Sequence, residues 1–213
     1  MATLQDPVTS QPAGVDPLHK AVRFSLRPPE SLGWNSIGAQ SGLITGLAAN
    51  GAVFSFRNLG VNPILIKRVG VGYLCSTVFT TAQKVDFGLF VARAFSGSDT
   101  GGNQIAITGS NTKHRTSLAT PNNVDMRIAA AAVLTAGTKT LDTNPLGIVG
   151  AWVPGAGTII NFAQDNLLNH AAGDHPIVLT QNEGINILNL TAMGAAGVGS
   201  FYVNLEFAEV TNY

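Results

Sequence analysis

The sequence predicts an all-β fold: an antiparallel β-sandwich or jelly-roll-like domain with an extended N-terminal arm and long loops. Three observations support this prediction. Apolar residues recur with a period of two from about residue 50 onward, no long amphipathic helical pattern occurs, and the chain contains 24 glycines, many in turn-like stretches. Short alternating segments separated by glycine-rich turns are typical of sandwiches and jelly rolls.

The first 30 residues differ from the rest, because they carry five prolines. Each proline removes a backbone donor and favours an extended conformation in the residue before it. We therefore expect an extended arm over 1–30 and one β-sandwich domain over 31–213. Within the arm, Val22, Phe24 and Leu26 alternate with Arg23, Ser25 and Arg27. This pattern predicts a short strand able to pair with a sheet edge of its own subunit or of a neighbour.

Four segments of the domain alternate clearly enough to predict which side of each strand faces the core. They are GAVFSFRNL, RVGVGYLCS, KVDFGLFVARAF and SFYVNLEFAEV, and Asn50-Gly51 before the first is a strong turn pair. Phe90 is an apolar residue on the opposite side of its strand. The residues predicted to face the core are Phe54, Phe56, Val69, Val71, Tyr73, Cys75, Val85, Phe87, Leu89, Val91, Phe201, Val203, Leu205 and Phe207.

Three segments are harder to interpret. Residues 96–123 form a long polar stretch in which only IAI, 105–107, is strand-like, and such loops are usually functional or interfacial. In VDMRIAAAAVLTAG, 124–137, the alanines favour a helix, but the alternation at the start favours a strand, which we expect. In INILNL, 185–190, the apolar residues switch faces after Ile187, which indicates a β-bulge or a strand covered on both faces.

Glu183 lies in a polar corner, Gln181 to Gly184, between two apolar runs. Gly184 is suited to a positive φ, and the corner predicts a turn between two strands. Glu183 itself could be a carboxylate placed for chemistry, a subunit contact or a turn cap. The turn-capping or solvated role is favoured, and a nearby carboxylate partner would reopen the question of chemistry.

Composition argues against several classes of function. The 12 basic and 12 acidic residues cancel and only 11% of residues are charged, so nucleic acid and anionic membranes are not expected partners. Such a surface favours association with other proteins. The chain has a single cysteine, Cys75, so it cannot form an intrachain disulfide. We expect Cys75 to be a small buried hydrophobic residue. We expect neither a standard secretion signal nor a membrane-spanning segment.

Candidate sites are few. No G-x-S-x-G motif and no P-loop are present. In NHAAGDHP, the residues His170, Asp174 and His175 could bind a metal, but a polar loop leading into the strand IVLT explains the same residues, so we expect no metal and no cofactor.

Lys113, His114 and Arg115 form the densest basic patch of the chain. A contact to a neighbouring subunit is favoured there over a bound anion. Together with the arm's arginines they give the predicted subunit or capsid interface: Arg23, Arg27, Lys113, His114 and Arg115.

An enzymatic function is not expected. The acidic residues are scattered singly, apart from Glu206 and Glu209, whereas glycoside hydrolysis needs a carboxylate pair. Trp34 and Trp152 could form a platform that stacks on sugars, or could simply pack. An all-β glycan-active enzyme, and a tail or head-fibre protein that binds host carbohydrate, stay as alternatives.

The order of the segments DFGLFVARAFSGSDTGG, KHRTSL, DMRIAAAAVLTAGTKTLDTNPLG, HPIVLTQNEGINI and FYVNLEFAEV resembles virion structural proteins of tailed bacteriophages, of the cement, decoration or auxiliary capsid type. The resemblance covers roughly residues 65–210 and includes no catalytic signature. It implies a compact β fold on the virion's capsid surface, made in the host cytoplasm, that clamps the major capsid protein and associates with itself, most often as a trimer. On this basis we expect residues 1–30 and the loop 96–123 to make most intersubunit contacts.

Overall fold

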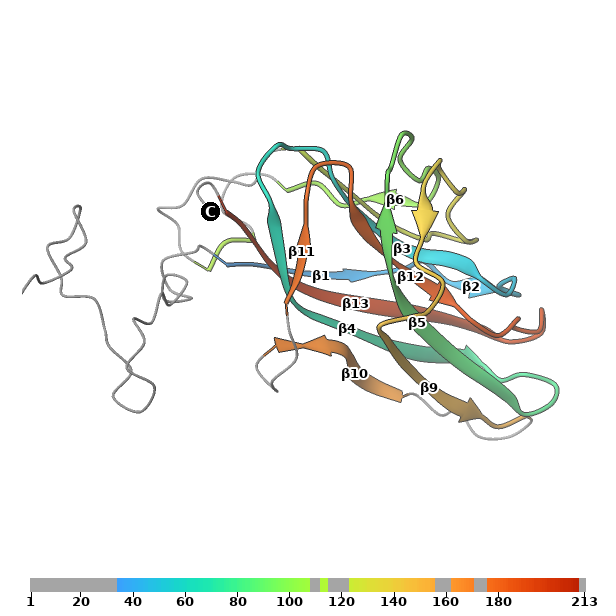
Figure 1. Ribbon diagram of the computed structural model, residues 1–213. Helices are drawn as coiled ribbons and strands as arrows, with labels where there is room; N and C mark the ends of the chain where they lie inside the picture. The colour runs from blue at the N-terminus through green and yellow to red at the C-terminus, as the bar shows by residue number, and fades with distance from the viewer. Residues whose placement is uncertain (1–33, 108–111, 115–122, 156–161, 171–175, 211–213) are drawn as a thin grey trace, which may run out of the picture. The chain divides into compact units, whose positions relative to one another are not determined.

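A computed structural model of the protein describes residues 34–107, 112–114, 123–155, 162–170 and 176–210 (Figure 1). These described residues lie in one compact unit. The predicted N-terminal arm, with its alternating segment 22–27, lies outside the described residues. No helix among the described residues is long and apolar enough to cross a membrane.

Two antiparallel sheets pack against each other, which confirms the predicted all-β sandwich (Figure 1). The first sheet has six strands in the order β1-β13-β4-β10, with β11 also pairing with β4 and β2 pairing with β13. Its strands are β1 (Asn35–Gln40), β2 (Ile44–Thr45), β4 (Ile64–Thr77), β10 (Phe162–Asn169), β11 (Ile177–Leu179) and β13 (Val198–Glu209).

The second sheet has seven strands in the order β6-β7-β3-β12-β5-β8, with β9 also pairing with β5. Its strands are β3 (Gly51–Asn58), β5 (Gln83–Arg93), β6 (Asn103–Gln104), β7 (Val124–Ile128), β8 (Thr140–Leu141), β9 (Gly147–Val153) and β12 (Gly184–Asn189). The chain crosses between the sheets several times, so neighbouring strands are often distant in sequence.

The core between the sheets is built from the residues that the alternation predicted. All of the predicted core residues are buried in one cluster. Phe56 of one sheet meets Phe207 of the other edge-on, with ring centroids 5.4 Å apart, and Phe87 meets Phe201 at 5.9 Å. Each buried phenylalanine contributes about 1.5–3 kcal/mol through removal of apolar surface from water. This burial is the main force that holds the two sheets together.

A second, smaller apolar cluster covers the outer side of the seven-stranded sheet. Phe90 and Leu188 of the sheet pack there with Leu134, which comes from the segment between β7 and β8. The backbone N–H of Leu134 donates to Ala52 of β3 at 2.8 Å, which holds this segment over the sheet. This cluster explains why Phe90, on the side of its strand away from the main core, is apolar.

The sequence INILNL left two explanations open, a β-bulge or a strand covered on both faces, and the structure confirms the second for β12. A register shift does occur where Ile187 and Leu188 pair with Phe54 and Ala52, but the extra residue there is Val53 of β3, and β12 pairs with β5 in unbroken register. Ile185 and Ile187 face the main core, while Leu188 joins the outer cluster and Leu190 packs against it. Strict alternation of side chains along β12 accounts for this arrangement, because its odd-numbered residues face the main core and its even-numbered residues face the outer cluster.

Two predictions about the middle of the chain need revision. Residues 105–107 are not a strand; the short strand β6 lies just before them, and Ile105 and Ile107 pack against the main core instead. The segment 124–137 begins as the predicted strand, β7, which ends at Ile128. The alanines that follow are neither strand nor helix, because the chain leaves the sheet there to cover its outer face.

Candidate functional site

The corner that contains Glu183 connects β11 to β12. Asn182 adopts the left-handed conformation of this turn, with φ 63°, so the expected positive φ falls on Asn182 and not on Gly184. Gly184 is instead the first residue of β12, where a Cβ would lie 2.0 Å from the carbonyl oxygen of Phe56. Glycine is required there for close approach of the neighbouring strand.

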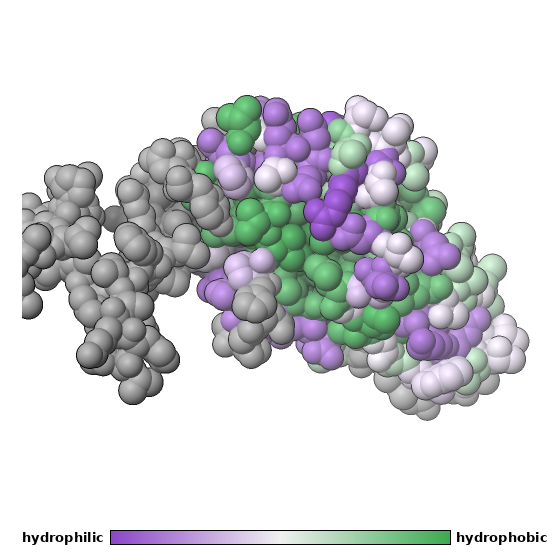
Figure 2. All heavy atoms as spheres, in the orientation of Figure 1, coloured by the Kyte–Doolittle hydropathy of each residue, from purple (hydrophilic) through white to green (hydrophobic). Residues whose placement is uncertain are grey.

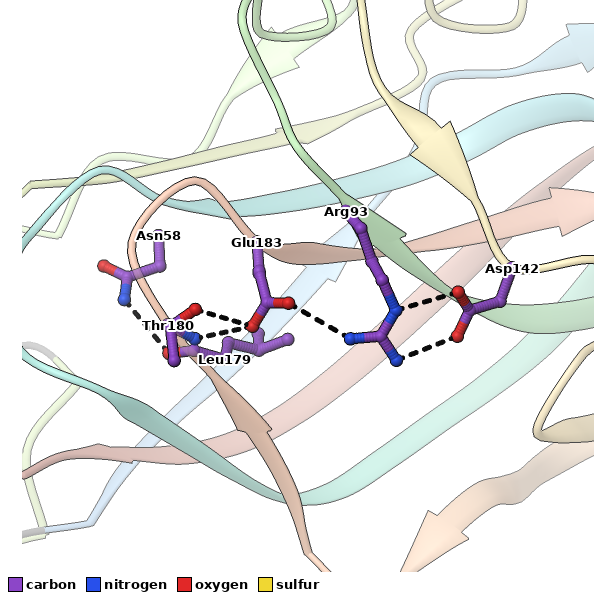
Figure 3. A network of polar contacts seen from close by, with 6 residues as sticks. All are labelled: Asn58, Arg93, Asp142, Leu179, Thr180 and Glu183. Carbon is purple, nitrogen blue, oxygen red and sulfur yellow. Dashed lines mark hydrogen bonds and ion pairs between the residues drawn. The ribbon is translucent and has the colours of Figure 1, made fainter.

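Glu183 caps this turn (Figure 3). Its Oε2 accepts hydrogen bonds from the backbone N–H and from the hydroxyl of Thr180, both at 2.9 Å. Its Oε1 accepts a hydrogen bond from Arg93 Nη1 at 3.1 Å. The favoured sequence interpretation, a turn-capping carboxylate, is therefore confirmed.

Arg93, the last residue of β5, joins Glu183 to a second carboxylate, Asp142 (Figure 3). Arg93 Nε donates to Asp142 Oδ1 at 2.9 Å and Nη2 donates to Oδ2 at 3.0 Å, a bidentate pair. Burial raises the pKa of Glu183, but the hydrogen bonds from Thr180 and Arg93 outweigh it and lower that pKa overall. The hydrogen bond to Asp142 is the largest cause that raises the pKa of Arg93.

Asp142 and Glu183 bind the same arginine, so the two carboxylates have to be considered as a catalytic pair. A glycosidase needs one carboxyl group with a raised pKa that can donate a proton. Here a guanidinium lies between the two carboxylates, and the pKa of Glu183 is lowered. The arrangement instead ties three segments together: the end of β5, the residue after β8 and the β11–β12 turn.

Another carboxylate, Asp99, belongs to the loop that follows β5 and is buried. It forms an ion pair with Lys139, and its Oδ1 accepts a hydrogen bond from Gly137 N at 2.7 Å. Its Oδ2 accepts one from Asn186 Nδ2 of β12 at 2.7 Å. Burial raises the pKa of Asp99, but these bonds and one from Ser55 lower it overall. Residues far apart in the sequence meet here, so no local pattern predicted the cluster.

The remaining candidate pair of carboxylates, Glu206 and Glu209, does not act together. Glu206 pairs with Lys67 Nζ at 2.9 Å, and Glu209 accepts a hydrogen bond from Asn62 Nδ2 at 2.8 Å. Each carboxylate thus has its own partner and a structural explanation.

Two residues of the predicted interface are described, Lys113 and His114, and both lie along β1. The N–H of Ser36 donates to the Thr112 carbonyl at 2.8 Å, and the N–H of His114 donates to the Trp34 carbonyl at 2.9 Å. His114 Nε2 also lies 2.5 Å from Ser36 Oγ. This segment covers the start of β1, at Asn35 and Ser36, on the edge away from β13. Arg23, Arg27 and Arg115 lie outside the described residues.

The predicted metal ligands and the predicted sugar platform receive less support. His170 follows β10, whereas Asp174 and His175 lie outside the described residues; no group of three His, Cys, Asp or Glu side chains in the described part of the chain could hold a metal. Trp34 stacks with Lys67 Nζ, 5.0 Å from its ring, and precedes β1. Trp152 belongs to the other sheet, so the two tryptophans do not form one platform.

The outer side of the six-stranded sheet carries an arrangement that sequence reasoning missed. Two glycines of β4 leave room for side chains of the neighbouring strands to lie flat. A Cβ on Gly72 would lie 2.3 Å from Tyr202 Cζ, and one on Gly70 would lie 2.2 Å from Gln164 Nε2. Asn204 of β13 donates to Gln164 Oε1, which completes a layer of side chains parallel to the sheet. The alternation V-G-V-G in β4 was the available signal.

We call this surface the flat face: the outward side of β1, β13, β4 and β10 around Gln40, Gln164, Tyr202 and Asn204. None of these four side chains is charged, and each is exposed or half-buried. Toward one end, Glu206 and the exposed Arg68 lie opposite each other on the same side of the sheet and carry charge. Four strands span about 20 Å, and β13 gives a length of about 40 Å, so this whole outward side measures at most about 800 Å². That is the area one partner contributes to a standard protein interface.

Comparison of the chain with protein-family models, with curated proteins and with solved structures finds no match.

Proposed function

We propose that this chain is a non-enzymatic structural protein that binds the outer surface of a capsid shell and stabilises it, as the resemblance to phage cement and decoration proteins implies. Its partners would be the major capsid protein and further copies of itself, and its place would be the capsid surface of the virion. Neither nucleic acid nor a membrane is part of this role.

The flat face is the observation that carries the proposal. Protein interfaces are depleted in charged residues and enriched in aromatic residues at their centres. Tyr202 and the amides of Gln40, Gln164 and Asn204 have this character, and the glycines beneath them make the surface level. A level surface can approach another protein over its whole area without large rearrangement.

The carboxylates support a structural role over a catalytic one. Asp99, Asp142 and Glu183 all pair with a cation, and the pKa is lowered for both Asp99 and Glu183. These groups are held ionised and positioned to stabilise the fold. The fibre alternative requires aromatic and carboxylate side chains grouped in one groove. Trp34 lies just before β1 and Trp152 lies in β9 of the other sheet, so the two tryptophans do not supply that group.

A bound clamp stabilises a shell by mass action. Any molecule that binds the assembled state but not the dissociated state favours assembly by its binding free energy. An interface of about 800 Å² per partner is enough for specific binding without dense charge. No catalytic step is needed.

Binding to expanded phage heads that lack the protein tests the proposal. The purified chain should co-sediment with the heads and saturate at a fixed ratio. The double variant Gln40→Arg/Gln164→Arg places two charges on exposed positions of the flat face and should bind at least about tenfold more weakly. Thr81→Arg, on the exposed turn between β4 and β5, is the matched control and should bind normally. Absence of co-sedimentation, or equal binding by all three proteins, contradicts the proposal.

The predicted contribution of the arm is tested separately. Deletion of residues 1–20 should lower occupancy on expanded heads, while circular dichroism shows the same β content. If occupancy is unchanged, the arm does not contribute to binding, and the flat face alone carries it.

A further inference from the structure

We infer that the outer edge of β9 is a contact surface for a second copy of this chain, whose own β9 pairs with it antiparallel about a two-fold axis near Gly150. This inference concerns self-association and does not depend on binding to a capsid.

β9 lies at the edge of its sheet. Its seven residues pair with β5 in an unbroken register from Gly147↔Leu89 to Val153↔Gln83. Within the described residues, no strand pairs with its other edge. β10 approaches β9 at its first residue, where a Cβ on Gly147 would lie 2.1 Å from the carbonyl oxygen of Leu167. The backbone groups of residues 148–153 that point away from β5 are therefore left without a strand partner in the described chain.

The other described edges carry features that block pairing with another chain. β1 is covered at its first two residues by the segment 112–114, and β10 has two register shifts and an exposed Asp165. β2, β6 and β8 have two residues each, and β11 has three. β9 has no charge, no proline and no bulge. Soluble proteins usually protect an edge of this kind, because unpaired backbone groups invite a further strand.

The exposed side chains of β9 are apolar. Ile148 is 58% exposed and Trp152 is 68% exposed, and both project from the same side of the strand, on either side of Gly150. Leu146, just before the strand, is 54% exposed. Figure 2 shows hydrophobic side chains gathered in the middle of this view, between β11 and the start of β9 in Figure 1. Tryptophan in particular is enriched among residues that dominate binding energy.

The sequence of β9 favours a second copy as the occupant. Two antiparallel β9 strands centred on Gly150 would place Ile148 of each copy opposite Trp152 of the other. An aromatic residue opposite a β-branched residue is a favourable cross-strand pair, and the symmetry provides it twice. The chain has a formal net charge of zero, so two copies do not repel each other. The result is a dimer, whereas the resemblance to phage proteins implies a trimer.

Analytical ultracentrifugation of the full chain tests the contact. The wild type should sediment as a dimer that dissociates on dilution. Ile148→Lys adds a charge to the exposed edge and should raise the dimer dissociation constant at least about tenfold. Val61→Lys, at a site that is 78% exposed in the β3–β4 connection, is the matched control and should remain dimeric. A wild type that is monomeric at all concentrations, or a trimer unaffected by Ile148→Lys, overturns the inference.

Disulfide trapping tests the register. Ile148→Cys mixed with Trp152→Cys should form a cross-linked dimer on mild oxidation, because opposite residues lie within disulfide range. Each variant alone should not, because two copies of residue 148 would be about 13 Å apart along the strands. The flat-face variant Gln40→Arg/Gln164→Arg should still dimerise. A dimer lost in that variant but kept in Ile148→Lys would overturn the β9 contact without affecting the proposed capsid binding.

Discussion

The Tyr202 ring lies over Gly72, so close to it that a side chain on residue 72 would clash with the ring. A Cβ there would lie 2.3 Å from Tyr202 Cζ and 2.4 Å from its Oη. The glycine therefore determines that the tyrosine ring lies along the sheet and does not project from it. Gly70 does the same for Gln164. Two glycines in one strand thus produce the flat face on which the proposed function depends.

Gly72→Ala should displace the Tyr202 ring and destabilise the protein. Overpacking of a packed core costs about 1–3 kcal/mol, but the end of the half-buried Tyr202 ring can move aside, so the free energy of unfolding should fall by about 1 kcal/mol or less. Gly97→Ala is the control, because the nearest atom to its Cβ would be 3.5 Å away, an ordinary contact. Urea denaturation measures both variants. Equal stability of the two would show that the ring does not need the space above Gly72.

The Arg93–Glu183 contact predicts a pH dependence. Because the pKa of Glu183 is lowered in the folded protein, its carboxylate adds stability above its ordinary pKa of 4.5 and loses it as the pH falls through the lower folded value. Glu183→Gln should therefore cost at most about 1 kcal/mol at pH 7, since Arg93 is half exposed, and less at pH 3. Thermal unfolding at both pH values measures the difference. A cost that is larger at pH 3 than at pH 7 would contradict this account.

Lys139 should matter more for stability than an exposed cation. Its side chain is 5% exposed and Asp99 is fully buried, so Lys139→Met leaves a buried carboxylate without its cation. Removal of one partner of a buried ion pair typically costs about 3–5 kcal/mol. Arg68→Met, at an exposed position of β4, is the control and should change the free energy of unfolding by about 0.5 kcal/mol or less. Guanidinium denaturation that gives similar values for the two variants would refute the structural role of the Asp99 cluster.

Cys75 should be unreactive in the folded protein. Its side chain is buried, and burial raises the pKa of the thiol, an effect that the hydrogen bond to the Thr77 carbonyl only partly offsets. Thiolate is the reactive form, so labelling by iodoacetamide at pH 7.5 should be slow until denaturant is added. The chain has one cysteine, so mass spectrometry gives the extent of labelling directly. Rapid labelling of the native protein would contradict the buried position.

Patterns within a single strand could be predicted from the sequence. The period of two identified the core positions of β3, β4, β5 and β13, because each strand has one side against the core. The change of face in INILNL predicted a strand covered on both faces, which describes β12, whereas the nearby bulge lies in β3. The corner at Glu183 was predicted as a turn, although the residue that takes the positive φ is Asn182.

Relationships between distant segments could not be predicted. Asp99 meets Lys139, Gly137 and Asn186 only because the loop after β5 folds over the outer side of the sheet. The sequence does not show why β4 has glycine at positions 70 and 72. The reason is that the neighbouring strands place Gln164 over Gly70 and Tyr202 over Gly72. A single sequence does not state which strands are neighbours, so the ion-pair cluster has no local signature, and the V-G-V-G alternation of β4 does not show which side chains cover its glycines.

Imaging of the intact particle tests the central claim most directly. We predict density for this chain on the outer surface of the capsid, with the side of the sandwich formed by β1, β13, β4 and β10 turned toward the shell. Density at the tail or at a fibre tip, or a capsid-bound chain with the flat face turned to solvent, would contradict it.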